Sequence, residues 1–122
     1  MKYLGTYAGP DGESHFAELE ADLHAVEFVP GRPLVELSTA LPAAATAFAR
    51  LPPGWHGDYH PSPRRQVVVP VSGEMVVTTS DGETRRIGPG TIWLLEDTTG
   101  KGHLTRVPDS GEFLGVLVWL AE

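Results

Sequence analysis

Short apolar runs separated by turn residues recur along the whole chain, and this pattern predicts β-strands rather than helices. The run from Gln66 to Val71 is apolar and rich in β-branched residues, which is typical of a buried strand. A longer apolar run, Glu112–Leu120, predicts the last strand. The remaining predicted strands cover Tyr3–Ala8, Leu34–Leu41, Ala44–Leu51, Glu74–Thr79, Thr84–Ile87, Thr91–Leu95 and His103–Val107.

One segment, Phe16–Ala25, supports two interpretations. Its odd positions are Ala or Leu, and its even positions from Glu18 to His24 are charged or polar. Such alternation predicts a strand with one face in water, whereas the many Ala and Glu residues would also suit a helix. We expect the strand.

Turn residues separate these runs at short intervals. Asp81-Gly82 is the strongest hairpin signal in the chain, because this pair favours a type I′ turn. Many short strands joined by Gly, Pro and Asp turns are typical of a β-sandwich or barrel. With 122 residues and no evident linker or repeat, we expect a single domain over residues 1–122.

Composition narrows the classes of function. A net charge of −7 argues against a surface for nucleic acid or anionic membrane, both of which require clustered Lys and Arg. The absence of cysteine excludes disulfides, a thiolate nucleophile and zinc–thiolate sites. No apolar run approaches the roughly 18 residues of a spanning helix, and the first residues do not resemble a signal peptide. We therefore expect a cytoplasmic protein that binds neither nucleic acid nor membrane.

The chemistry-bearing residues concentrate between Gly54 and His103. Gln66 is followed after six residues by Gly73, and His60 precedes it in a loop rich in turn residues. Further along, Gly90-Thr91 begins a strand and the loop after it ends at His103. This arrangement resembles the two motifs of the cupin superfamily, in which the first motif has a His-x-His pair, a carboxylate or amide ligand, six residues and a glycine. The chain departs from the family pattern at Ser62, which stands where the second histidine would fall.

The resemblance implies an all-β fold, the double-stranded β-helix or jelly-roll barrel of the RmlC-like cupins. The barrel core would cover about residues 44–120, with additional N-terminal strands within residues 3–41. It also implies that His60, Gln66 and His103 converge inside the mouth of the barrel.

Two neutral imidazoles and an amide carbonyl are suitable ligands for a divalent transition metal such as Zn, Fe, Ni or Mn. His56, four residues before His60, is a candidate fourth ligand, although loop histidines are usually only solvated. The alternative is a hydrogen-bonded polar network of Gln66 and the histidines without a metal.

Two further side chains are candidates for a catalytic role beside His60 and His103. Arg64 would share the face of Gln66 and bind an anionic or enolate oxygen, unless it is simply a surface arginine. Asp97 would orient His103 or act as a general base, although a loop aspartate also suits an Asx turn, which we favour. The residues expected to line the substrate pocket are Tyr59, Val68 and Trp93.

Two functions remain open at this point. The first is a metal-assisted enzyme that acts on a small organic molecule, with isomerase, cyclase or lyase chemistry ranked above dioxygenation because an amide replaces the usual carboxylate. The second is a metal-free cupin that binds a small ligand as a sensor or carrier, or acts only by proton transfer. We also expect a homodimer whose interface involves the alternating strand Ala17–Ala25 and the final strand Glu112–Leu120.

Overall fold

The computed structural model describes residues 1–122 and contains eleven strands and no helix. The strands are β1 (Lys2–Ala8), β2 (Ser14–Glu20), β3 (His24–Val26), β4 (Val35–Leu37), β5 (Ala43–Leu51), β6 (Gln66–Ser72), β7 (Met75–Thr79), β8 (Thr84–Ile87), β9 (Trp93–Glu96), β10 (His103–Arg106) and β11 (Phe113–Leu120). No segment forms a helix with the length and apolarity needed to cross a bilayer. The all-β prediction is therefore confirmed.

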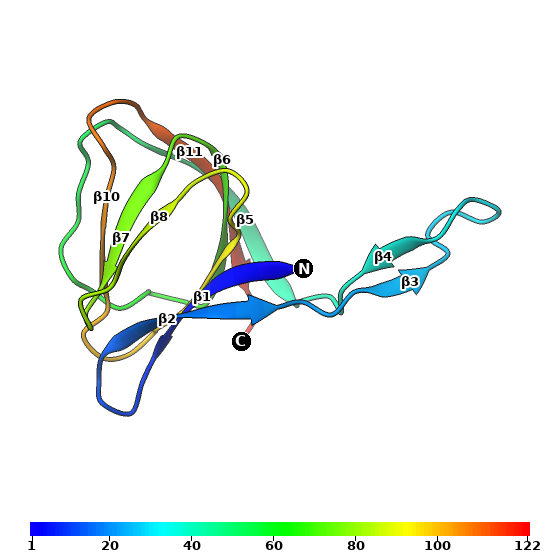
Figure 1. Ribbon diagram of the computed structural model, residues 1–122, viewed down its shortest axis with the longest axis horizontal. Helices are drawn as coiled ribbons and strands as arrows, with labels where there is room; N and C mark the ends of the chain where they lie inside the picture. The colour runs from blue at the N-terminus through cyan, green and yellow to red at the C-terminus, as the bar shows by residue number, and fades with distance from the viewer.

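Two sheets enclose the core (Figure 1). The larger sheet has six strands in the order β2-β1-β9-β6-β11-β5, and the smaller has three in the order β10-β7-β8. Neighbouring strands are antiparallel except β1 and β9, which are parallel. Pro70 lies within β6, where its missing N–H is accommodated by a shift of register in β11 between Leu114 and Gly115.

The apolar faces of the two sheets meet in one core. β1, β6, β9 and β11 contribute from the larger sheet, and β7 and β8 from the smaller one. The buried cluster consists of Leu4, Val68, Met75, Val77, Ile87, Trp93, Leu95, Val107 and Phe113. The N-terminal strands thus complete the same sheet as the strands of the predicted barrel core.

The loop between β5 and β6, residues 52–65, extends the smaller sheet along the free side of β10. Isolated bridges pair His56 with Arg106 and His60 with His103. Both hydrogen bonds of the second bridge are present, His60 N to His103 O and His103 N to His60 O, each 3.1 Å long. This pairing brings the two histidines next to each other although 43 positions separate them in the chain.

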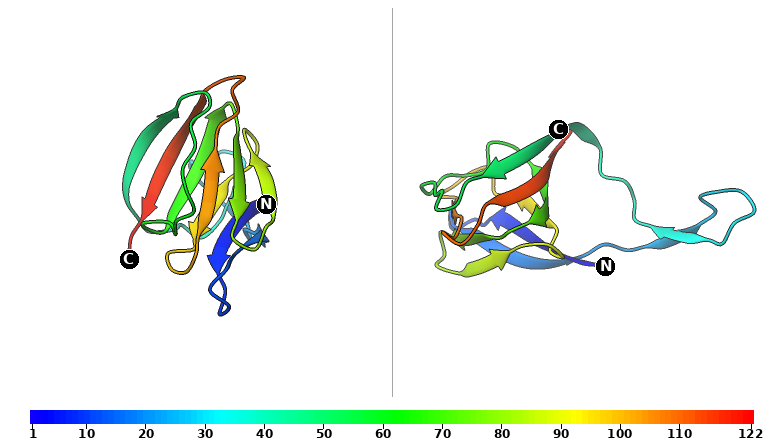
Figure 2. Two further views of the ribbon diagram at one scale, coloured as in Figure 1. Left: turned by 90° about the vertical axis from the view of Figure 1, so that its left-hand side faces the viewer. Right: turned by 90° about the horizontal axis from the view of Figure 1, so that it is seen from above.

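The predicted strand Phe16–Ala25 is wrong in its extent. β2 ends at Glu20, and the chain then leaves the barrel and forms the separate two-stranded sheet of β3 and β4 (Figure 2). The period-two pattern continues across this point, because residues on both sides are extended. The predicted strand Leu34–Leu41 is likewise too long, because only Val35–Leu37 of it forms a strand, β4.

The turn at Asp81-Gly82 also differs from the prediction. A type I′ turn needs positive φ at both central residues, but no residue other than glycine has positive φ. Instead Gly82 N donates to Thr79 O (2.9 Å) and Gly82 has φ of 97°, which gives a three-residue hairpin loop closed by a glycine bulge. Asp81 stabilises this loop, because its Oδ1 accepts hydrogen bonds from Thr79 Oγ1 (2.6 Å) and Glu83 N (3.1 Å).

His15 joins the hairpin turn of β1–β2 to that of β7–β8. Its Nε2 lies 3.0 Å from Asp11 Oδ2 and its Nδ1 lies 3.0 Å from Asp81 Oδ2. Hydrogen bonding to Asp11, assisted by Asp81, raises the pKa of His15 above its ordinary 6.5. The pKa of Asp11 is lowered by the amide of Glu13 and by His15, and that of Asp81 by Thr79 and, to a lesser degree, by the Glu83 amide and His15.

We expect this cluster to make stability depend on pH. A raised histidine pKa stabilises the fold fully below pH 6.5, and the contribution is lost as pH rises through the folded value. The lowered pKa values of Asp11 and Asp81 stabilise the fold fully above pH 3.8, and this stabilisation is lost as the pH falls through their folded values. Urea unfolding of the native chain and of His15→Gln should therefore differ most between pH 3.8 and 6.5, and the difference should disappear as the pH rises through the raised pKa of His15. His56→Gln, which removes an exposed histidine, is the control, and a constant difference at every pH would contradict the prediction.

Candidate functional site

A cavity of about 160 Å³ lies between the two sheets. Three of the residues that line it are His60, Gln66 and His103, so the structure brings together the three side chains that the motif spacing selected. The cavity is small beside the roughly 300–1,000 Å³ typical of pockets for drug-sized ligands. It therefore suits a small organic molecule.

The two imidazoles lie next to each other, with ring centroids 5.4 Å apart. His60 is exposed, and its Nδ1 lies 2.8 Å from the carbonyl oxygen of Asp58. A carbonyl can only accept, so Nδ1 donates and Nε2 is the free ring nitrogen of the neutral imidazole. His103 is buried, and Trp93 packs edge-on against it with centroids 5.5 Å apart.

Asp97 holds His103 from behind. Its Oδ2 accepts hydrogen bonds from His103 Nδ1 (2.7 Å) and from the hydroxyl of Ser14 (2.8 Å), and its side chain is wholly buried. A carboxylate at Nδ1 fixes the tautomer and leaves Nε2 free, as in metal-ligating and catalytic histidines. Asp97 does not line the cavity, so the structure supports orientation of His103 and opposes the general-base role. The favoured Asx turn is wrong, because the side chain bonds to His103 and Ser14 instead.

The second oxygen of Asp97, Oδ1, is buried and has no hydrogen-bond partner. A buried carboxylate that is only half satisfied is costly unless a positive charge lies close by. The carboxylate therefore places negative charge directly behind the imidazole of His103, on the side opposite its free Nε2.

Gln66 is oriented by Ser62, the residue that replaces the family's second histidine. The Ser62 hydroxyl donates to Arg64 O (2.6 Å) and accepts from Gln66 Nε2 (3.1 Å). With its nitrogen bound in this way, the amide keeps Oε1 as its free acceptor. Ser62 therefore does not supply a ligand atom itself but orients the side-chain amide of Gln66.

Apolar side chains form the rest of the wall. The predicted pocket residues Val68 and Trp93 line the cavity, and Trp93 Nε1 donates to the buried hydroxyl of Thr6 (2.8 Å). The other lining residues are Ala49, Leu51, Trp55, Met75, Leu95, Thr105, Phe113 and Leu117. No Lys or Arg lines the cavity, so it offers no fixed positive charge from a basic side chain.

Three predicted site residues do not reach the cavity. The guanidinium of Arg64 stacks on the indole of Trp119, 4.5 Å from the ring centroid, because Arg64 precedes β6 and does not follow its alternation. His56 and Tyr59 are exposed and absent from the cavity wall. The structure therefore does not bring Arg64, His56 or Tyr59 to the cavity where the sequence placed them.

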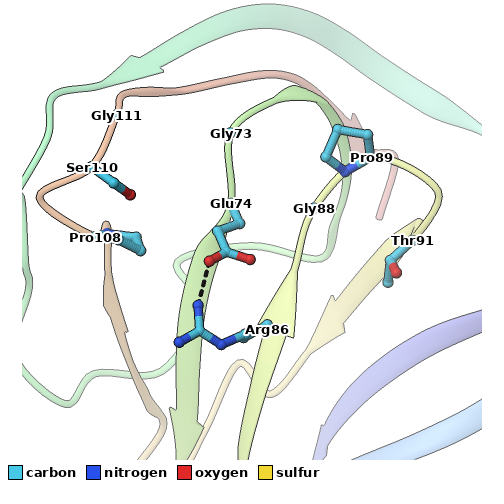
Figure 3. Close-up of a pocket in the computed structure, with 9 residues that line it drawn as sticks. All are labelled: Gly73, Glu74, Arg86, Gly88, Pro89, Thr91, Pro108, Ser110 and Gly111. Carbon is cyan, nitrogen blue, oxygen red and sulfur yellow. Dashed lines mark hydrogen bonds and ion pairs between the residues drawn. The ribbon is translucent and has the colours of Figure 1, made fainter.

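A second hollow, of about 610 Å³, is larger but is a weaker candidate (Figure 3). Polar and turn residues line it, and its two charged side chains, Arg86 and Glu74, form an ion pair with each other. The charges of Arg86 and Glu74 thus neutralise each other. The cavity with the two histidines carries the free donor atoms and is the candidate active site.

No protein-family model matches the sequence, and no curated protein matches it either. Among solved structures, the chain is similar to DMSP lyase DddQ from Ruegeria pomeroyi DSS-3, with 22% identity, a TM-score of 0.54 and coverage of 84% of this chain. The match covers only 47% of that lyase, so the chain spans about half its length.

Two other structures match over most of their own length. A Cupin 2 conserved barrel domain protein from Salinispora arenicola CNS-205 shows 19% identity and a TM-score of 0.53, covering 84% of this chain and 79% of that one. An RmlC-like cupin family protein with a double-stranded β-helix fold from Methanocaldococcus jannaschii shows 17% identity and a TM-score of 0.53, covering 84% and 91%. Both names agree with the fold that the motif spacing predicted. The chain therefore has the double-stranded β-helix fold of these proteins.

Proposed function

We propose that this cupin is an enzyme that transforms a small, largely apolar organic molecule in the cavity between its sheets, with the help of a divalent metal ion. The observation that carries the proposal is the convergence of His60, Gln66 and His103 on one cavity, each held by its own hydrogen-bond partner. Polar groups fixed in this way among apolar walls are what a small-molecule active site requires.

The donor set fits a divalent transition metal. His60 and His103 each offer Nε2 and Gln66 offers its amide oxygen, which makes a set of two nitrogen ligands and one oxygen ligand with open positions. The buried carboxylate of Asp97 supplies the negative charge that these neutral ligands lack. When bound, such an ion acts as a Lewis acid toward a carbonyl or related oxygen.

The chain's own residues bind the substrate and move the proton. Trp93, Val68 and Phe113 would enclose the apolar part of the substrate and exclude water. Where the Nε2 of His60 or His103 is not engaged as a metal ligand, it would take a proton from the substrate, while the Asp97 carboxylate holds the Nδ1 of His103. Proton transfer of this kind underlies isomerase, cyclase and lyase reactions, which we place above dioxygenation because the site has an amide where redox iron sites usually have a carboxylate.

A second candidate is a metal-free cupin that binds a small ligand or acts by proton transfer alone. One observation favours it: no group of three or more His, Cys, Asp or Glu side chains is arranged to hold a metal ion, and the third donor is an amide.

Metal analysis of the untagged protein distinguishes the two candidates. For the metal-assisted enzyme, we expect about one divalent ion per chain and a loss of affinity of at least roughly tenfold in His60→Ala and in His103→Ala. Elemental analysis and titration with Zn²⁺, Ni²⁺, Mn²⁺ or Fe²⁺ measure both quantities. His56→Ala is the matched control, because it removes an exposed histidine four residues from His60 and should leave the affinity unchanged. Negligible metal uptake by the native chain would leave the metal-free candidate.

A further inference from the structure

The segment between β2 and β5, residues 21–42, leaves the barrel and returns to it. We call it the arm. It begins beside one edge strand of the larger sheet, β2, and ends at the other edge strand, β5. Figure 1 and the right view of Figure 2 show β3 and β4 projecting away from both sheets.

The arm is apolar and uncovered. Seven of its large apolar side chains are at least 38% exposed, with Phe28 at 68% and Leu34 at 62%. The others are Leu23, Val29, Val35, Leu37 and Leu41, at 38–54%. Soluble monomers rarely expose so much contiguous apolar surface, and such patches mark interfaces.

The strands of the arm have no support from the barrel. β3 and β4 have three residues each and pair only with each other. An isolated two-stranded ribbon is at best marginally stable in water, and a further apolar surface is normally needed to order it. We therefore expect a further apolar surface to cover β3 and β4.

A suitable surface is present on the same molecule but away from the tip of the arm. The outer face of the larger sheet carries Val67, Val116 and Val118, and Phe48 on the edge strand β5 is 89% exposed. Beside these residues, at the base of the arm, lies a hollow of about 340 Å³. Tyr3, Val67 and Ile92 of the barrel line one part of it, and Ala21, His24 and Leu41 at the base of the arm line another.

We propose that the arm packs against the outer sheet face and the hollow at the base of the arm in a second copy of this chain. One molecule carries both an apolar projection and an apolar receiving surface, and the two are displaced from each other. A two-fold axis then satisfies both at once, because each arm covers the sheet of the other copy in a self-complementary interface. Of the two strands expected at the interface from the sequence, β2 is an edge strand of the larger sheet, and β11 lies between β5 and β6 and would contribute its outer face.

The area is sufficient for a stable dimer. A large apolar side chain removes on the order of 100 Å² from water when it is buried, so the half-exposed side chains of two arms account for roughly 700 Å². An equal area on the receiving surfaces brings the total to about 1,400 Å², within the range of specific interfaces.

Sedimentation velocity on the untagged chain at tens of micromolar tests the proposal. We expect the native chain to sediment with twice the mass of one chain. The double variant Phe28→Asp, Leu34→Asp should be monomeric, with the dissociation constant of the dimer raised at least about a hundredfold. Both side chains are exposed in the single chain, so the variant should keep the near-ultraviolet circular dichroism of its buried tryptophan. The milder Phe28→Ser should give an intermediate dissociation constant.

Tyr59→Asp is the matched control. Tyr59 is 51% exposed and lies on loop 52–65, on the far side of the barrel from the arm, so this variant should remain dimeric (Figure 1). A monomeric native chain would overturn the proposal and would leave a different protein as the partner of the arm. An arm variant that stays dimeric, or one that loses its tertiary structure, would overturn it as well.

Discussion

Replacing Gly102 with alanine is expected to lower the free energy of unfolding by more than about 3 kcal/mol. Gly102 has φ of 80°, and a Cβ at this position would overlap the backbone carbonyl of His60 and the nitrogen of Pro61. These atoms cannot move aside freely, because His60 is paired with His103 through two backbone hydrogen bonds. The substitution should therefore separate the two histidines as well as destabilise the barrel.

Urea unfolding and metal titration measure both effects, and Gly82→Ala is the control. Gly82 has φ of 97°, but a Cβ there would meet no atom within 4 Å, so only the backbone strain remains. That strain costs about 1–2 kcal/mol. Equal losses of stability in the two variants would show that the close approach of Gly102 to His60 is not what holds the loop.

Replacing Asp97 with alanine should cost about 3–5 kcal/mol of stability, since it removes one partner of a buried pair. His103 Nδ1 and the Ser14 hydroxyl would both lose their acceptor in a buried place. We also expect the affinity for a divalent ion to fall roughly 10–100-fold, because the tautomer and orientation of His103 are no longer fixed. Urea unfolding and calorimetric titration give the two values.

Asp58→Ala provides the comparison for that experiment. Asp58 is exposed, and it holds His60 through its backbone carbonyl, which the substitution retains. It should therefore leave both stability and affinity within error of the native chain. An Asp97→Ala variant with the stability of Asp58→Ala would refute the structural role assigned to the buried carboxylate.

The apolar runs predicted the barrel strands well because each run has the length of one strand and ends at Gly, Pro or Asp. β6 begins at Gln66 as predicted, and β8 covers Thr84–Ile87 as predicted. The arm was missed because its alternation of apolar and polar residues is the same as that of a sheet strand. Periodicity reports an extended backbone with two faces, and it does not report what each face contacts.

The central part of the site was readable from spacing, since His60, Gln66 and His103 follow a motif whose geometry the fold fixes. Arg64 was misplaced because alternation was extended two residues before the start of β6. The hydrogen bond from Ser14 to Asp97 could not be predicted. The two residues lie 83 positions apart, and a lone serine at the start of a strand carries no signal for such a contact. Such contacts depend on how β2 and the loop after β9 meet in space.

Loop 52–65 supplies both an imidazole and, through Trp55, part of the cavity wall. The bridges at His56 and His60 hold it along β10, and the amide of Ser62 donates to the carbonyl of Asp97. If this segment swings outward to admit a molecule, it carries His60 away from His103 at the same time. Passage of ligand and dismantling of the donor set would then be a single motion, so exchange rates and metal retention should rise and fall together.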